Sequence, residues 1–133
     1  MLAPLRVVRD LGNFMTGEKA EKLGAGVREV REARVLSGDA GKLLKAMGCT
    51  EHYRVRRRGY HFRLLLAGQV VDVSLLLLEV KEGLLVPGHW LVETTCKTTQ
   101  EEYPAAVAAL MEAAEMMAGH VEMRKPELGL RPR

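Results

Sequence analysis

The side chains that most often perform chemistry show no catalytic pattern in this 133-residue chain. Ser37 and Ser74 lack the glycines of a nucleophile elbow, so acyl transfer has no support. Cys49 and Cys96 form no Cys-x-x-Cys pair, which favours reduced thiols over a metal site or a disulfide framework. The four histidines lack zinc-ligand spacing. These histidines are His52, His61, His89 and His120. We therefore expect no catalytic residue, no cofactor and no metal ligand.

A dense run of arginines is the most unusual chemical feature of the chain. The segment Arg54–Arg58 contains four of them. Such a run is commonly a solvated strand edge, where charge discourages aggregation. It can also meet an acidic protein surface or nucleic-acid phosphates. Only Tyr53, Tyr60 and Phe62 are available nearby to stack on bases, and no nucleic-acid-binding motif surrounds them. We therefore favour protein contact, expect no direct nucleic-acid binding, and keep the solvated edge as the next interpretation.

Aromatic residues near this run extend the expected interface. In a strand, Trp90 would most often be a core residue, yet tryptophan is also enriched in binding hot spots. The residues that we predict to contact a partner are Arg54, Arg56, Arg58, Tyr60, Phe62 and Trp90.

Length and composition indicate one globular domain, because domains commonly hold about 100 to 150 residues. Hydrophobic residues make up 47% of the chain and charged residues 28%, which excludes disordered and fibrous classes. The net charge of +3 permits weak association with an acidic partner. No apolar run approaches the roughly 18 residues of a membrane span, and the N-terminus lacks the features of a secretory signal. A cytoplasmic or nuclear protein without membrane contact is expected.

The elements that must position these side chains are mainly strands. Residues 52–66 alternate without a plainly polar or plainly apolar side, which is typical of a strand inside a barrel or shared with a partner. Residues 70–80 are almost continuously apolar, as in a sheet covered on both faces. Ala67-Gly68 joins the two as an antiparallel hairpin. A further strand is expected over residues 89–98.

Helical spacing and caps predict two helices. Apolar residues recur at helical spacing over residues 102–118, and alanine fills the intervening positions. A short helix near residues 39–47 follows capping oxygens and ends at Gly48. Elsewhere we expect a strand over residues 5–11, a polar loop over residues 16–22 and a last strand over residues 120–124. Residues 27–36 are ambiguous, with local spacing that leans weakly toward helix.

Short segments between Leu5 and Pro126 form an ordered series. They are Arg9-Asp10-Leu11-Gly12, Leu43-Leu44-x-x-Met47-Gly48, Glu51-His52, Arg58-Gly59-Tyr60-His61-Phe62-Arg63, Val70 to Val80, Leu85-Val86-Pro87-Gly88, Leu91-Val92-Glu93, the Pro104 helix and His120-Val121-Glu122-Met123-Arg124-Lys125-Pro126. In this order they resemble the Mediator complex subunit 18 family, a head-module component of the RNA polymerase II coactivator. The resemblance looks closest to members from the green plant lineage.

The resemblance implies an α+β fold, mainly an antiparallel β-barrel or half-barrel similar to tunnel-type RNA triphosphatases. It also implies a strand over residues 27–36, against the local pattern, since pairing often overrides propensity. Family members carry several strands before the segment corresponding to Leu5. We therefore expect a single barrel-like domain over residues 1–126 without those strands, with edges open to a partner, and a flexible tail over residues 127–133.

The function implied by the resemblance is that of a noncatalytic, nuclear Mediator subunit that bridges transcription regulators and RNA polymerase II. Its expected partners are other head subunits, especially subunit 20 and the C-terminal helix of subunit 8, with RNA polymerase II contacted indirectly. The alternative is a metal-dependent triphosphate hydrolase of the tunnel fold, which needs converging carboxylates and phosphate-binding arginines. The available carboxylates are scattered and never paired as Glu-x-Glu, which disfavours this alternative. They are Asp72, Glu79, Glu93 and Glu122.

Overall fold

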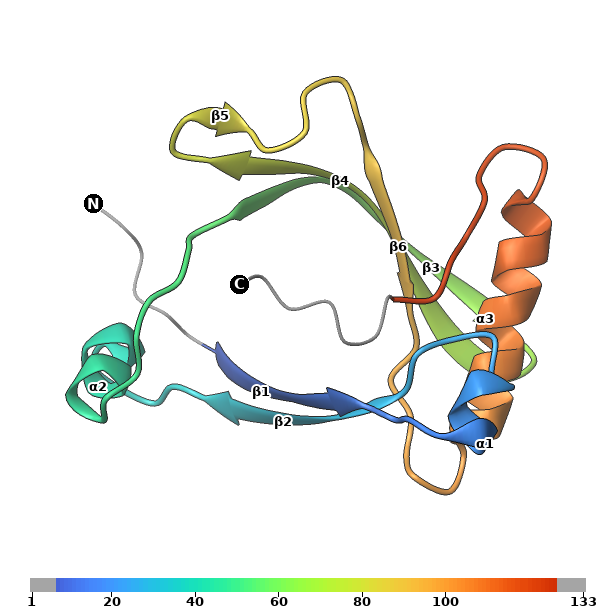
Figure 1. Ribbon diagram of the computed structural model, residues 1–133, viewed down its shortest axis with the longest axis horizontal. Coiled ribbons are helices and arrows are strands. Elements are labelled where there is room, and N and C mark those ends of the chain that lie inside the picture. The colour runs from blue at the N-terminus through green and yellow to red at the C-terminus, as the bar shows by residue number, and fades with distance from the viewer. Residues whose placement is uncertain (1–6, 127–133) are drawn as a thin grey trace. The chain divides into compact units, whose positions relative to one another are not determined.

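The computed structural model describes residues 7–126 as a mixed α+β protein with antiparallel sheets and three helices (Figure 1). The chain divides into two compact units. One unit holds Met1–Phe14 and Arg28–Arg54, and the other holds Met15–Val27 and Val55–Arg133.

The first unit is a two-stranded antiparallel sheet followed by a short helix. Strand β1 (Val7–Phe14) pairs with β2 (Arg28–Arg34), and the register shifts before Phe14. Helix α2 (Ala40–Ala46) begins where the Asp39 side chain accepts a hydrogen bond from the Gly41 amide at 2.8 Å. The strand implied by family resemblance for residues 27–36 is confirmed, and the local leaning toward helix was wrong.

The second unit is built on a four-stranded antiparallel sheet. Strands β3 (Arg56–Leu66) and β4 (Gln69–Val80) form the expected hairpin, and β4 also pairs with β5 (Gly83–Leu84) and β6 (Leu91–Thr95). The turn uses Ala67 at φ 50° and Gly68 at φ 76°. Two successive left-handed residues match the twist of a tight hairpin, which explains the glycine. Strand β4 therefore lies in the centre of the sheet.

Helix α3 (Tyr103–Met117) covers part of one face of this sheet (Figure 1). Val71 and Val73 of β4 are buried against Ala109 and Ala113 of the helix. The two alanines have small side chains, so the helix backbone can approach the sheet closely. Larger side chains complete the core at its margin, namely Leu64, Leu66, Leu110 and Met117. This core fixes β4, and with it the two strands that carry the candidate site.

Two expectations about local structure were wrong. Residues 16–22, expected as a polar loop, contain the one-turn helix α1 (Glu18–Glu21). The Lys125 ammonium stabilises its end by donating to the carbonyl oxygens of Ala20 and Leu23 at 3.0 and 3.1 Å. Residues 120–124, expected as a strand, form none, because the Val121 amide bonds back to the Met117 carbonyl at the end of α3.

The antiparallel pairing expected from the hairpin is confirmed, whereas closure is not. Between residues 7 and 126 no sheet closes on itself into a barrel: one sheet has two strands and the other has four. The tail expected over residues 127–133 lies outside the described residues. No helix in the described part of the chain is long and apolar enough to cross a membrane.

Candidate functional site

The register of β3, β4 and β6 assigns each side chain to one of two faces. Residues directly opposite each other in an antiparallel pair project to the same side. The pairs Leu64↔Val71 and Phe62↔Val73 therefore place the even-numbered residues of β3 on the side that α3 covers. The odd-numbered residues of β3 lie on the opposite side. We call these the helix-side face and the polar face.

Helix α3 leaves one end of the helix-side face uncovered, and an aromatic cluster lies there. The rings of Tyr60 and Trp90 stack with centroids 6.2 Å apart and an interplanar angle of 30°. Phe62 follows on the same row of β3. These side chains remain 61%, 52% and 50% exposed for Tyr60, Trp90 and Phe62 respectively. A contiguous exposed aromatic group of this kind commonly marks a site of interaction.

Two arginines border the aromatic cluster on the same row of β3. Arg58 forms an ion pair with Glu79 of β4 at 2.8 Å, whereas Arg56 makes no ion pair within residues 7–126. The guanidinium groups are weakly hydrated and can stack on aromatic rings or bind carboxylates. We call this set the aromatic–basic surface: Arg56, Arg58, Tyr60, Phe62 and Trp90.

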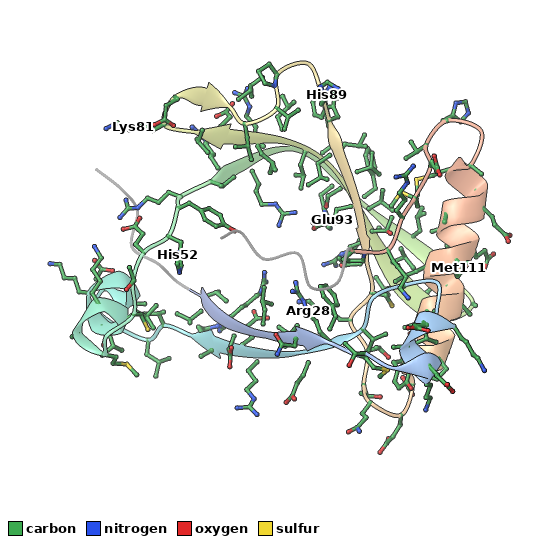
Figure 2. All side chains as sticks on the ribbon, viewed as in Figure 1. Arg28, His52, Lys81, His89, Glu93 and Met111 are labelled. Carbon is green, nitrogen blue, oxygen red and sulfur yellow. The ribbon has the colours of Figure 1, made fainter. Side chains whose placement is uncertain are left out.

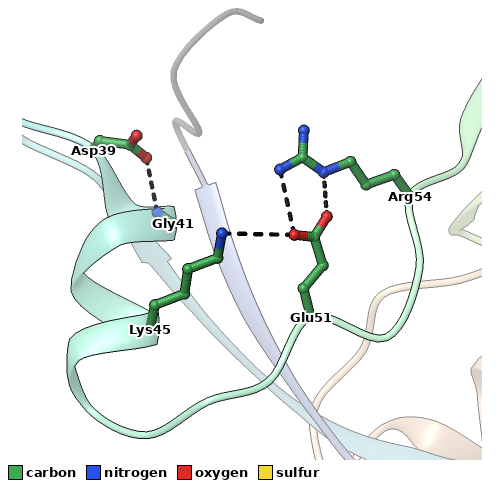
Figure 3. A network of polar contacts seen from close by, with 5 residues as sticks. All are labelled: Asp39, Gly41, Lys45, Glu51 and Arg54. Atoms are coloured by element: carbon green, nitrogen blue, oxygen red, sulfur yellow. Dashed lines mark hydrogen bonds and ion pairs between the residues drawn. The ribbon is translucent and has the colours of Figure 1, made fainter.

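Five of the six residues predicted as an interface thus share one face of one sheet. The sixth, Arg54, belongs to the other unit, where it binds Glu51 together with Lys45 (Figure 3). The hydrogen bond from Arg54 holds the pKa of the Glu51 carboxyl below its usual value, and the same contact raises the pKa of Arg54. Arg54 therefore has a local role in holding the segment after α2.

Trp90 also borders a small apolar depression. Its volume is about 190 Å³, and it is lined by Leu76, Leu78, Val86, His89, Trp90 and Leu91. Val86 and Leu91 are themselves largely exposed. The depression is large enough for an apolar side chain. Leu76 and Leu78 pair with odd-numbered residues of β3, so the depression opens on the polar face and not beside Tyr60 and Phe62.

The polar face carries a group of cross-strand contacts that sequence reasoning missed. Imidazole Nδ1 of His61 lies 3.1 Å from Ser74 Oγ, and its Nε2 lies 3.3 Å from Asp72 Oδ1. Arg63 donates to the same carboxylate oxygen at 3.1 Å. The signal was present in the sequence, because a hairpin closed at Ala67-Gly68 places His61 opposite Ser74.

This serine, histidine and aspartate resemble a catalytic triad in composition, but the surroundings do not support acyl transfer. Ser74 lies in the central strand, whose peptide groups pair in the plane of the sheet with β3 and β6. No backbone N–H of β4 therefore points out of this face to stabilise an oxyanion. Arg63 also holds Asp72 in place. We interpret the group as a cross-strand polar cluster that fixes the hairpin register.

The carboxylates considered for metal-dependent hydrolysis do not converge. Asp72 and Glu93 lie on the polar face, where Arg57 pairs with Glu93 at 2.7 Å, and Glu79 lies on the helix-side face. Figure 2 shows Glu93 on the side of β6 away from α3. Glu122 is ion-paired with Arg124 outside the sheet. Among the described residues no three acidic, histidine or cysteine side chains are grouped to hold a metal ion.

Cys96 is the one thiol close to the sheet contacts. Its Sγ lies 3.9 Å from the side-chain oxygen of Gln69. Burial, assisted by the negative charge of Asp72, raises the pKa of the Cys96 thiol. A raised pKa leaves less thiolate at neutral pH, which disfavours nucleophilic attack by this thiol.

Among curated proteins, the chain is similar to Mediator of RNA polymerase II transcription subunit 18 from Arabidopsis thaliana. The two are 26% identical over 132 residues, a match that covers 94% of this chain and 60% of the relative. The chain therefore spans less than two thirds of the length of the curated relative it matches. No protein-family model matches the chain, and no solved structure matches it significantly.

Proposed function

We propose that this protein is a noncatalytic subunit of the Mediator coactivator that acts in the nucleus through protein contacts. The similarity to subunit 18 over most of the chain supports this assignment. The single structural observation that carries a contact role is the aromatic–basic surface, where stacked aromatic side chains stay exposed beside arginines.

The proposed contact follows the usual anatomy of a protein interface. Tyr60, Phe62 and Trp90 supply large apolar area with few rotatable bonds, and such residues are enriched in hot spots. Arg56 and Arg58 lie beside them and can pair with carboxylates of the partner. Following the family resemblance, the partners we propose are the head subunits corresponding to subunit 20 and the C-terminal helix of subunit 8. Through them the protein would bridge transcription regulators and RNA polymerase II.

Co-expression tests the proposal directly. The chain is produced with partners corresponding to subunits 20 and 8 from its own source, and complexes are followed by co-elution and by titration of the purified components. We expect Tyr60→Ala combined with Trp90→Ala to weaken binding at least about tenfold, since hot-spot truncations cost more than 1 kcal/mol. Tyr53→Ala is the matched control, because Tyr53 is an exposed aromatic residue of the other unit.

Two results would contradict the proposal. A folded chain that co-elutes with neither subunit would exclude these partners. Equal losses from the paired substitution and from Tyr53→Ala would show that the aromatic–basic surface is not the contact. Circular dichroism of each variant separates lost binding from lost folding.

A further inference from the structure

The outer edge of β3 is the longest free strand edge of the four-stranded sheet. All eleven residues of β3 pair with β4 on one side, and no other strand within residues 7–126 pairs with β3. None of the backbone hydrogen bonds made outside the strand ladders and helices of the described chain involves β3. Most of its residues are exposed. In an antiparallel edge strand about half of the N–H and C=O groups point outward, where another strand can pair with them.

The charge of β3 has one sign. The strand contains four arginines, one histidine and no carboxylate. The carboxylates that pair with Arg57, Arg58 and Arg63 come from β4 and β6, and Arg56 has no carboxylate among the described residues. Each of those three guanidinium groups uses a single nitrogen in its ion pair, so most of its five N–H donors stay available.

A second copy of this chain is a poor occupant of the edge. Pairing of two β3 strands would place four arginines of each copy side by side, with no carboxylate on either strand. Like charges across a strand pair are destabilising. The free edge of β6 is a weaker alternative, because that strand is only five residues long and carries the acidic Glu93.

We propose that the outer edge of β3 binds an extended, acidic segment of a partner chain by strand addition. This inference deepens the proposed function and rests on it, because it names the class of segment that a partner would present. Main-chain hydrogen bonds along β3 provide affinity, and alternating side chains provide specificity. On one face the added strand lies beside Tyr60 and Phe62, and on the other it lies beside Arg57, His61 and Arg63. The segment should therefore alternate apolar residues with Asp or Glu.

Three synthetic peptides of the same length as β3 test the proposal. The first alternates Glu and Val, the second replaces every Glu by Lys, and the third repeats the first with amides of both strand edges N-methylated, so that it cannot pair as a strand through either edge. Binding is measured by fluorescence anisotropy, and hydrogen exchange locates the site. We expect the Glu peptide to bind at least about tenfold tighter than either control and to protect amides of β3.

Protein variants give a second measurement. Arg57→Glu should weaken the Glu peptide several-fold and strengthen the Lys peptide, because Arg57 lies on the face that takes the acidic residues of the peptide. The substitution also breaks the ion pair with Glu93, so circular dichroism is used to confirm that the variant is folded. Lys97→Glu is the matched charge reversal, since Lys97 follows β6, on the far side of the central strand, and it should have little effect.

The proposal is overturned if no peptide binds at about 1 mM, if the three peptides bind equally, or if protection falls on β6 instead of β3. Pairing between two copies of the chain at the β3 edge would also overturn it. If the peptides fail while the chain still co-elutes with subunits 20 and 8, the strand-addition proposal fails alone. Tight binding of the acidic peptide without co-elution would instead leave strand addition standing and exclude subunits 20 and 8 as the partners.

Discussion

Gly59 interrupts β3 between the arginines and the aromatic residues, and its backbone explains why no other residue serves there. Its φ is 156°, and a Cβ at this position would collide with the carbonyl oxygen of Leu75 in the neighbouring strand. Leu75 lies in β4, whose backbone is held by pairing on both sides. The obstacle is therefore main chain and cannot rotate away.

We predict that Gly59→Ala lowers the free energy of unfolding by roughly 2 kcal/mol or more, because the new methyl group forces β3 and β4 apart. Urea denaturation monitored by the fluorescence of Trp90, the single tryptophan of the chain, measures the change. Gly119→Ala is the control, since a Cβ there meets no atom within 4 Å. Equal midpoints for the two variants would show that the strand accommodates the methyl group.

The residues of the candidate site were partly predictable from the sequence. Alternation along β3 is enough to bring four of the predicted interface residues to one side of the strand. They are Arg56, Arg58, Tyr60 and Phe62. The stack of Trp90 on Tyr60 depends on how β6 pairs with β4, which no local pattern fixes. Arg54 was grouped with the others only because it continues the alternation, yet it precedes the strand and binds Glu51.

The central strand β4 contributes strongly to the stability of the sheet. Its two faces differ in burial, so substitutions on each face can be compared. Val71 is fully buried against α3, whereas its neighbour Val70 is 51% exposed on the polar face. We predict that Val71→Ala lowers the free energy of unfolding by about 2 kcal/mol, because it leaves a cavity under the helix. Val70→Ala should change stability by only about 0.5 kcal/mol. Chemical denaturation of both variants gives the comparison.

The reverse order of effects would place the helix on the other face and reassign the aromatic–basic surface. A loss of equal size from both substitutions would instead indicate that strand propensity, common to the two positions, dominates over burial.

Element prediction succeeded where local chemistry and final structure agree. Helix α3 has an apolar spacing and alanine-rich composition that favour helix anywhere, and the hairpin has a glycine where the turn needs left-handed backbone. Strand β2 reads Arg-Glu-Val-Arg-Glu-Ala-Arg, a sequence with good helical propensity, and every one of its residues is exposed. It is a strand because it pairs with β1, and that pairing is a tertiary fact.

For the whole molecule, the expected antiparallel strands are present while the expected closure is not found in residues 7–126. The local pattern located β3, β4 and β6, whereas it did not indicate β2 and wrongly indicated a strand over residues 120–124. Closure further requires each edge strand to find a second neighbour. Strands β3 and β6 each pair with β4 alone. No pattern in the sequence indicates which strand would pair with the free edges of the sheet. The barrel was therefore an expectation drawn from the family resemblance alone.

The two compact units differ in the means by which they can be stabilised. Ala40 is the single buried residue among the described positions of the first unit, and β2 is exposed along its length. A two-stranded sheet without a core is marginal in water. The second unit has the valine and alanine core under α3. The first unit should therefore open locally at a lower free energy than the second.

We predict that native-state hydrogen exchange shows amides of the β1–β2 pairs opening several kcal/mol below those of β4 near Val71. Hydrogen exchange also tests the proposed contact role. If partner binding orders the first unit, adding the Mediator subunits should raise the protection of amides in β1 and β2 more than that of amides in β4. Equal opening energies in the isolated chain would contradict the prediction. That result would instead support residues 1–126 as one cooperative domain, since every part would then open only with the whole.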